Sequence, residues 1–315
     1  MKLAVISLIV AITAIAAFGQ APPSLRIVTE DPNLPSELYY GDIKVKPLRL
    51  RPGTNQPMVF EDNDYFVFQH YVDFLGRMPD QAGYADWNNV LNTCTNQGKL
   101  GADAACDRTH VSSGFFRSPE FGDRGYWIYR FYNAAFGRLP KYAPEFKPEV
   151  QKLSGLQQTG AQLEASKAAF IDRFMTLPEF TGIYGAPTAA GASQFIATLE
   201  QKAGVTLPAS AQTDPGQPQQ YSRQQLIDLM TAGTLTPAQT LRAFIEQKVV
   251  WDKYFYRAFV AMEYFGYLKR DPEQAGYDDW VRVLTFGDAP TGIQPGDYRH
   301  LVFGFIWSIE YRARF

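Results

Sequence analysis

Two groups of residues in the sequence carry side chains of the kinds that enzymes use. His110 lies close to Ser112 and Ser113, a potential base beside two potential nucleophiles. Members of a catalytic triad usually come from separate elements, and the sequence has no Gly-x-Ser-x-Gly turn to expose a serine. Asp278 and Asp279 are adjacent, so on a helix their carboxylates point in different directions and cannot flank one bond. We therefore expect no catalytic residues and a protein that is not an enzyme.

The acidic residues 61–64, Glu-Asp-Asn-Asp, could be interpreted as a calcium loop. They lack the spaced oxygen ligands and the terminal Glu of an EF-hand, which favours a role in capping the first helix and complementing its dipole. The histidines His70, His110 and His300 do not cluster with the cysteines as zinc ligands would. The sequence predicts no metal and no cofactor.

One segment of the chain is repeated. Residues 77–87 read Arg-Met-Pro-Asp-Gln-Ala-Gly-Tyr-Ala-Asp-Trp, and residues 270–280 read Arg-Asp-Pro-Glu-Gln-Ala-Gly-Tyr-Asp-Asp-Trp. The second segment lies 193 residues after the first. Further along the two copies the offset is 190 residues, which relates His110 to His300. A degenerate copy between them, recognisable at residues 136–140 and 177–180, lacks the Gln-Ala-Gly-Tyr segment. Such repetition indicates a duplicated structural unit.

Each copy pairs an Arg after its first helix with a Glu at its third helix. We expect an ion pair within each unit, since bidentate Arg–carboxylate contacts suit a partly buried clamp. A ligand pocket lined by Arg and Glu is the alternative. The predicted clamps are Arg77 with Glu120, Arg138 with Glu179, and Arg270 with Glu310.

A Tyr-x-x-Trp pair lies on one helix face in both full copies. Aromatic residues at helical spacing usually form part of the core. If exposed, Tyr84 and Trp87, or Tyr277 and Trp280, could instead stack on sugar rings or bind a protein partner. These four residues are the candidate contacts for a ligand or partner.

The first residues predict export. Lys2 precedes an apolar stretch that ends at Phe18, and small residues at 17 and 19 predict cleavage after Gly19. No later segment is apolar and long enough to span a membrane, so the mature chain is expected to have no transmembrane segment. The protein is expected at the cell surface or outside the cell, with the periplasm as an alternative. In an exported chain, Cys94 and Cys106 are expected to form a disulfide.

Composition and pattern predict an all-α protein. With 46% hydrophobic and 20% charged residues the chain is globular, and a net charge of −2 argues against nucleic-acid binding. We expect repeated three-helix units in two lobes, 61–204 and 222–315, joined by a linker at 205–221. The signal peptide, 1–19, is followed by an extended segment, 20–60. Within it residues 43–51 alternate apolar and basic, which predicts a strand; Pro47 makes it an edge or isolated one.

The assembled motifs resemble a bacterial family, domain-of-unknown-function family 4214. Its pattern of Leu-Gly-Arg-x-Pro-Asp, Gly-Tyr before Trp, and Ser-x-Glu-Phe appears at residues 75–80, 83–87 and 118–121. The last copy repeats it at 268–280 and 308–311, except that Lys269 replaces the usual Gly, so that helix end is expected to close differently. The resemblance implies exported helical domains, distantly like phycobilisome linker domains, and carries no catalytic residues.

These observations favour an exported, non-catalytic surface or matrix protein that binds another extracellular protein or a polysaccharide. A carbohydrate-binding module is the alternative, and a hydrolase with an unrecognised site is the third hypothesis. Exposed aromatics around a shallow groove would favour the carbohydrate-binding module, and a deep cleft with convergent carboxylates would favour the hydrolase.

Overall fold

The structure is a computed structural model that describes residues 25–28, 36–40, 43–51, 56–95, 100, 103–154, 160–211 and 218–315. The predicted signal peptide, 1–19, lies outside the described residues, as does part of the predicted linker. The chain from residue 63 onward is predominantly helical, which confirms the expected all-α class. None of the described helices combines the length and the apolarity needed to cross a membrane.

The three copies each form a short series of helices. The first unit comprises α1 (Asn63–His70), η1 (Tyr71–Leu75), α2 (Gln81–Asn92), α3 (Arg108–Phe116) and α4 (Pro119–Asp123). The middle unit comprises α5 (Gly125–Phe136), η2 (Tyr142–Phe146), α6 (Lys147–Leu153), α7 (Gly160–Met175) and α8 (Pro178–Tyr184). The last unit comprises α12 (Lys248–Glu263), η4 (Tyr264–Leu268), α13 (Gln274–Phe286), α14 (Tyr298–Ile306) and α15 (Ile309–Arg312). Between the middle and last units lie η3 (Ala189–Gly191), α9 (Ala192–Ala203), α10 (Arg223–Thr231) and α11 (Pro237–Ile245).

The N-terminal segment forms a small antiparallel sheet with strand order β1-β2-β3-β4. Its strands are β1 (Leu25–Val28), β2 (Ser36–Tyr40), β3 (Ile43–Leu50) and β4 (Pro57–Met58). The expectation that residues 43–51 form an edge or isolated strand is wrong, because β3 pairs with β2 on one side and β4 on the other. Pro47 is tolerated because β4 pairs only with Arg49 and Leu50, and because the β2–β3 register is irregular between Glu37 and Tyr39.

The first helix of each unit ends in a left-handed residue. Gly76 has φ 67° and Gly137 has φ 72°, a conformation that glycine adopts without strain. Lys269 occupies the same position in the last unit with φ 58° and ψ 33°. The expectation that this helix end closes differently is therefore wrong: the backbone is the same, and a lysine adopts it.

Asp271 followed by Pro272 is a typical signal for the start of a helix, but α13 begins only at Gln274. The Asp271 carboxylate instead accepts a hydrogen bond from the backbone N–H of Tyr142 in the middle unit, at 2.6 Å. The helical residues after Thr236 are divided between two helices, since α11 ends at Ile245 and α12 begins at Lys248.

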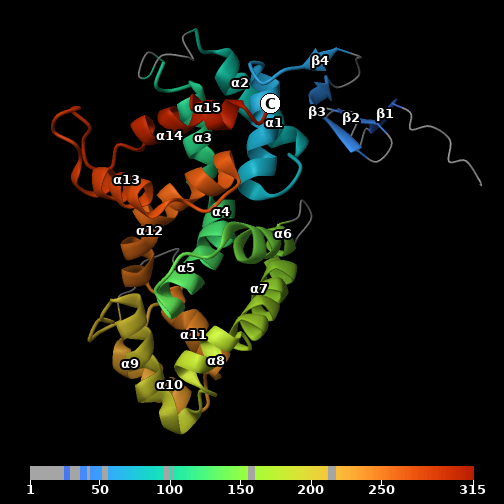
Figure 1. The fold of residues 1–315 in the computed structure, drawn as a ribbon. Coiled ribbons are helices and arrows are strands. Elements are labelled where there is room, and N and C mark those ends of the chain that lie inside the picture. Colours follow the sequence, from blue (N-terminus) through green and yellow to red (C-terminus); the bar gives the residue numbers. More distant parts are fainter. Residues whose placement is uncertain are drawn as a thin grey trace, which may run out of the picture.

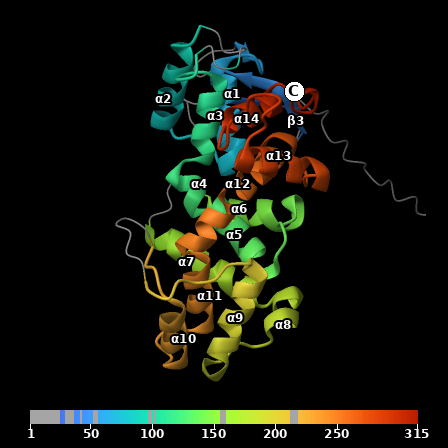
Figure 2. The same ribbon diagram turned by 90° about the vertical axis from the view of Figure 1, so that its left-hand side faces the viewer.

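The first and last units pack directly on each other. Helix α3 contacts α14, and η1 contacts η4, so equivalent elements of the two copies meet. This is the arrangement of a twofold-related pair. Figures 1 and 2 show these units together at one end of an elongated body and α8 to α11 at the other. Packing thus crosses the predicted boundary at 205–221, because α9 also packs on α10.

Candidate functional site

The bidentate Arg–Glu pair is present in every unit. In the first unit, Arg77 donates from Nε to Glu120 Oε1 and from Nη2 to Glu120 Oε2, both at 2.7 Å. Arg138 binds Glu179 through the same two nitrogens, and Arg270 binds Glu310 likewise. The pair ties the turn after the first helix to the start of the closing helix, as a structural clamp does.

Each clamp has further partners that sequence reasoning missed. A second carboxylate follows the arginine at a short distance in the chain, and a tyrosine six residues before the arginine lies beneath the guanidinium plane. The second carboxylates are Asp80, Glu145 and Glu273, and the tyrosines are Tyr71, Tyr132 and Tyr264. The hydrogen bonds that Arg138 donates to Glu145 and Glu179 raise its pKa. The fixed offset of the tyrosines in the three copies was a usable sequence signal.

The Tyr-x-x-Trp residues do not form an exposed platform. Tyr84 and Tyr277 are buried, with exposed fractions of 8% and 2%, so neither offers a ring face to a ligand. Tyr277 shares a hydrogen bond of 2.9 Å with Tyr129. Trp87 and Trp280 are half-buried against the core. For the two tyrosines, the prediction of ligand contact is therefore wrong, because the helix presents them to the interior.

The position of Trp87 explains why a glycine occupies position 114 in the first unit. Its ring stacks on Phe115, with centroids 5.7 Å apart. A Cβ on Gly114 would lie 2.6 Å from the ring, closer than real Cβ contacts. Trp87 is thus a wedge between α2 and α3.

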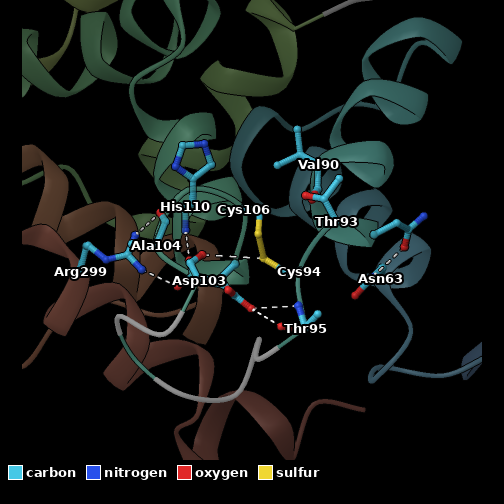
Figure 3. The surroundings of a disulfide bond; sticks show 12 residues. Asn63, Val90, Thr93, Cys94, Thr95, Asp103, Ala104, Cys106, His110 and Arg299 are labelled. Carbon is cyan, nitrogen blue, oxygen red and sulfur yellow. Dashed lines mark hydrogen bonds and ion pairs between the residues drawn. A yellow bond between two sulfur atoms is a disulfide. The ribbon is translucent and has the colours of Figure 1, made fainter.

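The disulfide between Cys94 and Cys106 is confirmed. Its loop is tied to the last unit, where Arg299 donates to the Ala104 carbonyl at 3.1 Å and pairs with Asp107 (Figure 3). Asp107 also caps α3 by accepting from the backbone N–H of His110. The disulfide therefore closes a loop that contacts the last unit.

The residues that resembled a nucleophile and base are not arranged as such. Ser112 shares a hydrogen bond with Tyr267 of the last unit, and the Ser113 hydroxyl donates to the backbone carbonyl of His110. Asp278 accepts from Gln274, whereas Asp279 binds Arg282, so the adjacent carboxylates point to different partners. These serines and carboxylates each contribute to local structure.

A buried polar cluster lies where η1 meets η4. The Asp73 carboxylate, 1% exposed, lies 2.7 Å from Lys269 Nζ and 3.1 Å from Arg314. Nearby, Nε2 of His70 lies 3.3 Å from the Tyr267 hydroxyl. Burial lowers the pKa of His70 to about 4, so this imidazole is neutral at neutral pH. The cluster joins the first unit, the last unit and the C-terminal residues.

Glu263 is the repeat equivalent of His70, since 70 plus 193 is 263. Its side chain is fully buried, its Oε2 has no hydrogen-bond partner, and burial raises its pKa well above the ordinary range. The duplicated position therefore carries a neutral imidazole in one unit and, in the other, a carboxyl group whose charged form is disfavoured by burial.

A polar depression opens beside the start of the first unit. It has a volume of about 460 Å³ and is lined by Arg51, Glu61, Asp62, Asn63, Asp64, Asn88 and Asn92. Arg51 reaches in from the end of β3 and binds Asp62 at 3.0 Å and Asp64 at 3.1 Å. Asp64 first, and then Asp62, raises the pKa of Arg51.

The acidic residues meet the expectation for α1 in part: Asp64 lies in its first turn and accepts from the backbone N–H of Tyr65 at 3.0 Å, whereas Asp62 does not cap the helix. Asp62 stands at the N-cap position, but its carboxylate accepts no bond from the helix. It accepts instead from the backbone N–H of Val59, at 2.8 Å, and it also binds Arg51. Among the described residues, no three His, Cys, Asp or Glu side chains are grouped as metal ligands. The calcium interpretation thus has no ligand set in this part of the chain.

The depression arises because the chain enters the two full units differently. Helix α12 begins at Lys248, whereas α1 begins at Asn63, the equivalent of Tyr256 by the offset of 193. In the first unit the sheet replaces two helical turns, and Arg51 from β3 meets the acidic residues there. The last unit carries Val281 and Thr285 where the first has Asn88 and Asn92. The polar lining is therefore specific to the first unit.

The fold and its repeated clamps define a helical repeat protein tied by Arg–Glu pairs. A family model described as "Domain of unknown function (DUF4214)" matches residues 60–125, which confirms the resemblance for the first unit. This segment is a DUF4214 domain. Searches of curated proteins and of solved structures each found no match.

Proposed function

We propose that this protein is an exported, non-catalytic scaffold that binds another molecule at the cell surface or in the extracellular matrix. The observation that carries the proposal is the packing of the first unit on the last. The Asp73–Lys269–Arg314 ion cluster and the disulfide-closed loop join two copies that are far apart in the sequence. A body built in this way holds its surface in one conformation, which lowers the entropic cost of binding a partner.

Export is part of this proposal. The charged first residues, the apolar stretch and the small residues before Gln20 support it, as does the disulfide, a bond typical of oxidising compartments. Expression of the full chain followed by mass spectrometry of its N-terminus tests it directly. A mature chain that begins at Gln20 is expected, and a cytoplasmic chain that retains Met1 would refute export.

Binding is tested by retention on defined surfaces. Secreted protein is mixed with insoluble polysaccharides, with peptidoglycan and with purified cell envelope, and the bound fraction is measured. We expect saturable retention on at least one of these surfaces. Retention on none of them would refute the proposal. Release of reducing sugars from a polysaccharide, lost on Glu61→Gln, would refute its non-catalytic part.

A carbohydrate-binding module is a second candidate function, because one observation favours it. The depression in the first unit is open to solvent and is lined only by polar side chains. Hydroxyl-rich ligands are recognised by such side chains, which donate and accept hydrogen bonds in pairs. Retention on one glycan, rather than on envelope proteins, would favour this function.

A further inference from the structure

We propose that Glu263 makes the packing of the first unit on the last unit dependent on pH, so that the two units pack closely in mild acid and separate as the pH rises. This inference names a regulation of the contact that carries the proposed scaffold function, and it rests on that function only for its biological use. Glu263 ends α12 and directly precedes η4, the element that contacts η1 of the first unit. The residue is buried, with an exposed fraction of 1%.

The approximate twofold relation between the units leaves Glu263 without a partner. On one side of it, Nε2 of His70 lies 3.3 Å from the hydroxyl of Tyr267, which also shares a hydrogen bond with Ser112. On the other side, the equivalent positions hold Glu263, Phe74 and Val302. Phenylalanine and valine side chains neither donate nor accept hydrogen bonds. One polar contact between the units is therefore complete, and its twofold counterpart retains only the carboxyl group.

The surroundings of this carboxyl group are aromatic. Four rings lie around the imidazole of His70, with centroids 3.9 to 5.7 Å away: Phe66, Phe74, Phe115 and Tyr267. Their equivalents by the same offsets are Phe259, Tyr267, Phe305 and Phe74, and all four are buried. The Phe74 ring lies in the contact between the units, 5.1 Å from the ring of Tyr267. In the part of the chain that the structure describes, no hydrogen bond reaches Glu263 Oε2.

No described cation compensates a charge on Glu263. Burial raises the pKa of its carboxyl group, with no opposing contribution from a neighbouring charge. Burial first, and then Glu263, raises the pKa of Tyr267. The charged groups on the neighbouring elements have other partners: Asp73 pairs with Lys269 and Arg314, Arg130 lies over the rings of Tyr126 and Trp251, Arg242 pairs with Glu246, and Arg282 pairs with Asp279. The tyrosines of these elements stay protonated because burial raises their pKa: Tyr71, Tyr129, Tyr264 and Tyr277.

Ionisation of Glu263 therefore opposes the packing. A carboxylate inside the contact would lose its water without gaining a cation or a donor, so the charged form favours separated units. Because folding raises the pKa of this group, its stabilising contribution is fully present below the ordinary pKa of 4.5. It is lost as the pH rises toward the raised value, by about tenfold in the ratio of packed to open protein for each pH unit. His70 has the opposite sign, since burial lowers its pKa from 6.5 to about 4.

The test is hydrogen–deuterium exchange of the purified protein from about pH 5 to about pH 8, read by mass spectrometry and corrected for the intrinsic exchange rate. The opening constants of peptides that cover η1 and η4 are compared between the unaltered protein and Glu263→Gln. This variant keeps the shape of the side chain and cannot ionise, and it retains His70, whose contribution cancels in the ratio. We expect the ratio of opening constants, unaltered over variant, to rise at least about tenfold between pH 5 and pH 7. Peptides from α9 and α10, at the other end of the body, should show no such rise (Figure 1).

A second measurement reads the protonation state directly. A protonated carboxyl group has an infrared carbonyl band distinct from that of a carboxylate, so the difference spectrum between the unaltered protein and Glu263→Gln at pH 7 should contain this band. Asp278→Asn is the matched control, because it removes a carboxylate from an exposed position on α13 of the same unit. It should leave the exchange ratio and the band unchanged. If Glu263→Gln does not fold, Glu263→Met supplies an apolar side chain of similar length for the same comparison.

Three results would overturn the inference. The ratio of opening constants stays constant with pH; it rises equally in α9 and α10, which would mean global unfolding; or the band of a protonated carboxyl group is absent at pH 7. If the exchange is independent of pH but the protein is retained on purified envelope, the inference fails while the scaffold function stands. If the exchange follows pH as expected and no surface retains the protein, the scaffold function fails while the inference stands.

Discussion

Replacing Lys269 by glycine sets two opposing contributions to stability against each other. A residue with a side chain in the left-handed conformation costs about 1 kcal/mol relative to glycine, and Lys269 has φ 58°. Against this, Lys269 Nζ lies 2.7 Å from the Asp73 carboxylate, whose side chain is 1% exposed. A hydrogen bond to a charged group contributes about 1.5–3 kcal/mol, and Asp73 retains Arg314 when the lysine is lost. With about 2 kcal/mol lost and about 1 kcal/mol gained, Lys269→Gly should lower the free energy of unfolding by about 1 kcal/mol.

The sign of this effect should reverse when the carboxylate is removed. In an Asp73→Asn background the ammonium retains only the backbone carbonyl of residue 73, 3.3 Å away, as an acceptor, so the backbone contribution outweighs what is left of the contact. Lys269→Gly should then raise the free energy of unfolding by about 1 kcal/mol, a coupling of about 2 kcal/mol between the two positions. Urea denaturation of the four proteins at neutral pH, followed by far-UV circular dichroism, measures the cycle.

The pH dependence provides an independent check. Burial by itself would raise the pKa of Asp73, but Lys269 and Arg314 hold it below its ordinary value of 3.8. A carboxyl group with a depressed pKa contributes stability above its unfolded pKa and loses it as the pH falls through its folded pKa. The coupling should therefore persist at neutral pH and vanish in strong acid. An increase in stability of the unaltered protein on Lys269→Gly at pH 7 would refute the reasoning, because the ion pair would then be weaker than the strain.

Three further perturbations separate the other contributions. Burial lowers the pKa of His70 from 6.5 to about 4, so as the pH falls the unfolded chain binds a proton at this residue before the folded protein does. The contribution of His70 to the free energy of unfolding should therefore fall by about 3 kcal/mol between pH 6.5 and 4. In urea denaturation, His70→Gln should abolish this pH dependence. Arg77→Ala should cost about 2–3 kcal/mol and Arg270→Ala less than about 1 kcal/mol, because their side chains are 11% and 38% exposed; equal losses of melting temperature would contradict this. Reduction of the Cys94–Cys106 disulfide, which spans 12 positions, should cost about 3 kcal/mol, measured by thermal unfolding with and without reductant.

The unit itself could be predicted from the sequence. Arg77 and Glu120 recur at matching places in three copies, and their opposite charges favour a contact, so the pairing follows from spacing and chemistry. The disulfide follows from two cysteines in a chain that the sequence predicts to be exported. Helical periodicity likewise predicted that Tyr84 and Trp87 share a face, although it did not predict which side chain lies deeper.

The depression could be predicted only in part. The acidic residues before α1 were recognised, but as a helix cap, because capping is the commonest local use of such residues. Their partner Arg51 comes from a strand whose pairing was not foreseen, and Asn88 carries no signal of its own within α2. The site depends on how the sheet meets the first helix, which no single segment specifies.

What the sequence determined by itself is therefore the repeated unit: its helices, its glycine turns and its clamps, all set by interactions between residues close together or repeated in register. Only the tertiary structure decided that the first unit packs on the last, with Asp73 meeting Lys269 nearly two hundred residues later. It also decided that Lys269 adopts the conformation of the glycine it replaces. The physical reason is that tertiary packing determines which residue becomes the stabilising partner of a buried charge, and the spacing of nearby residues does not specify that packing.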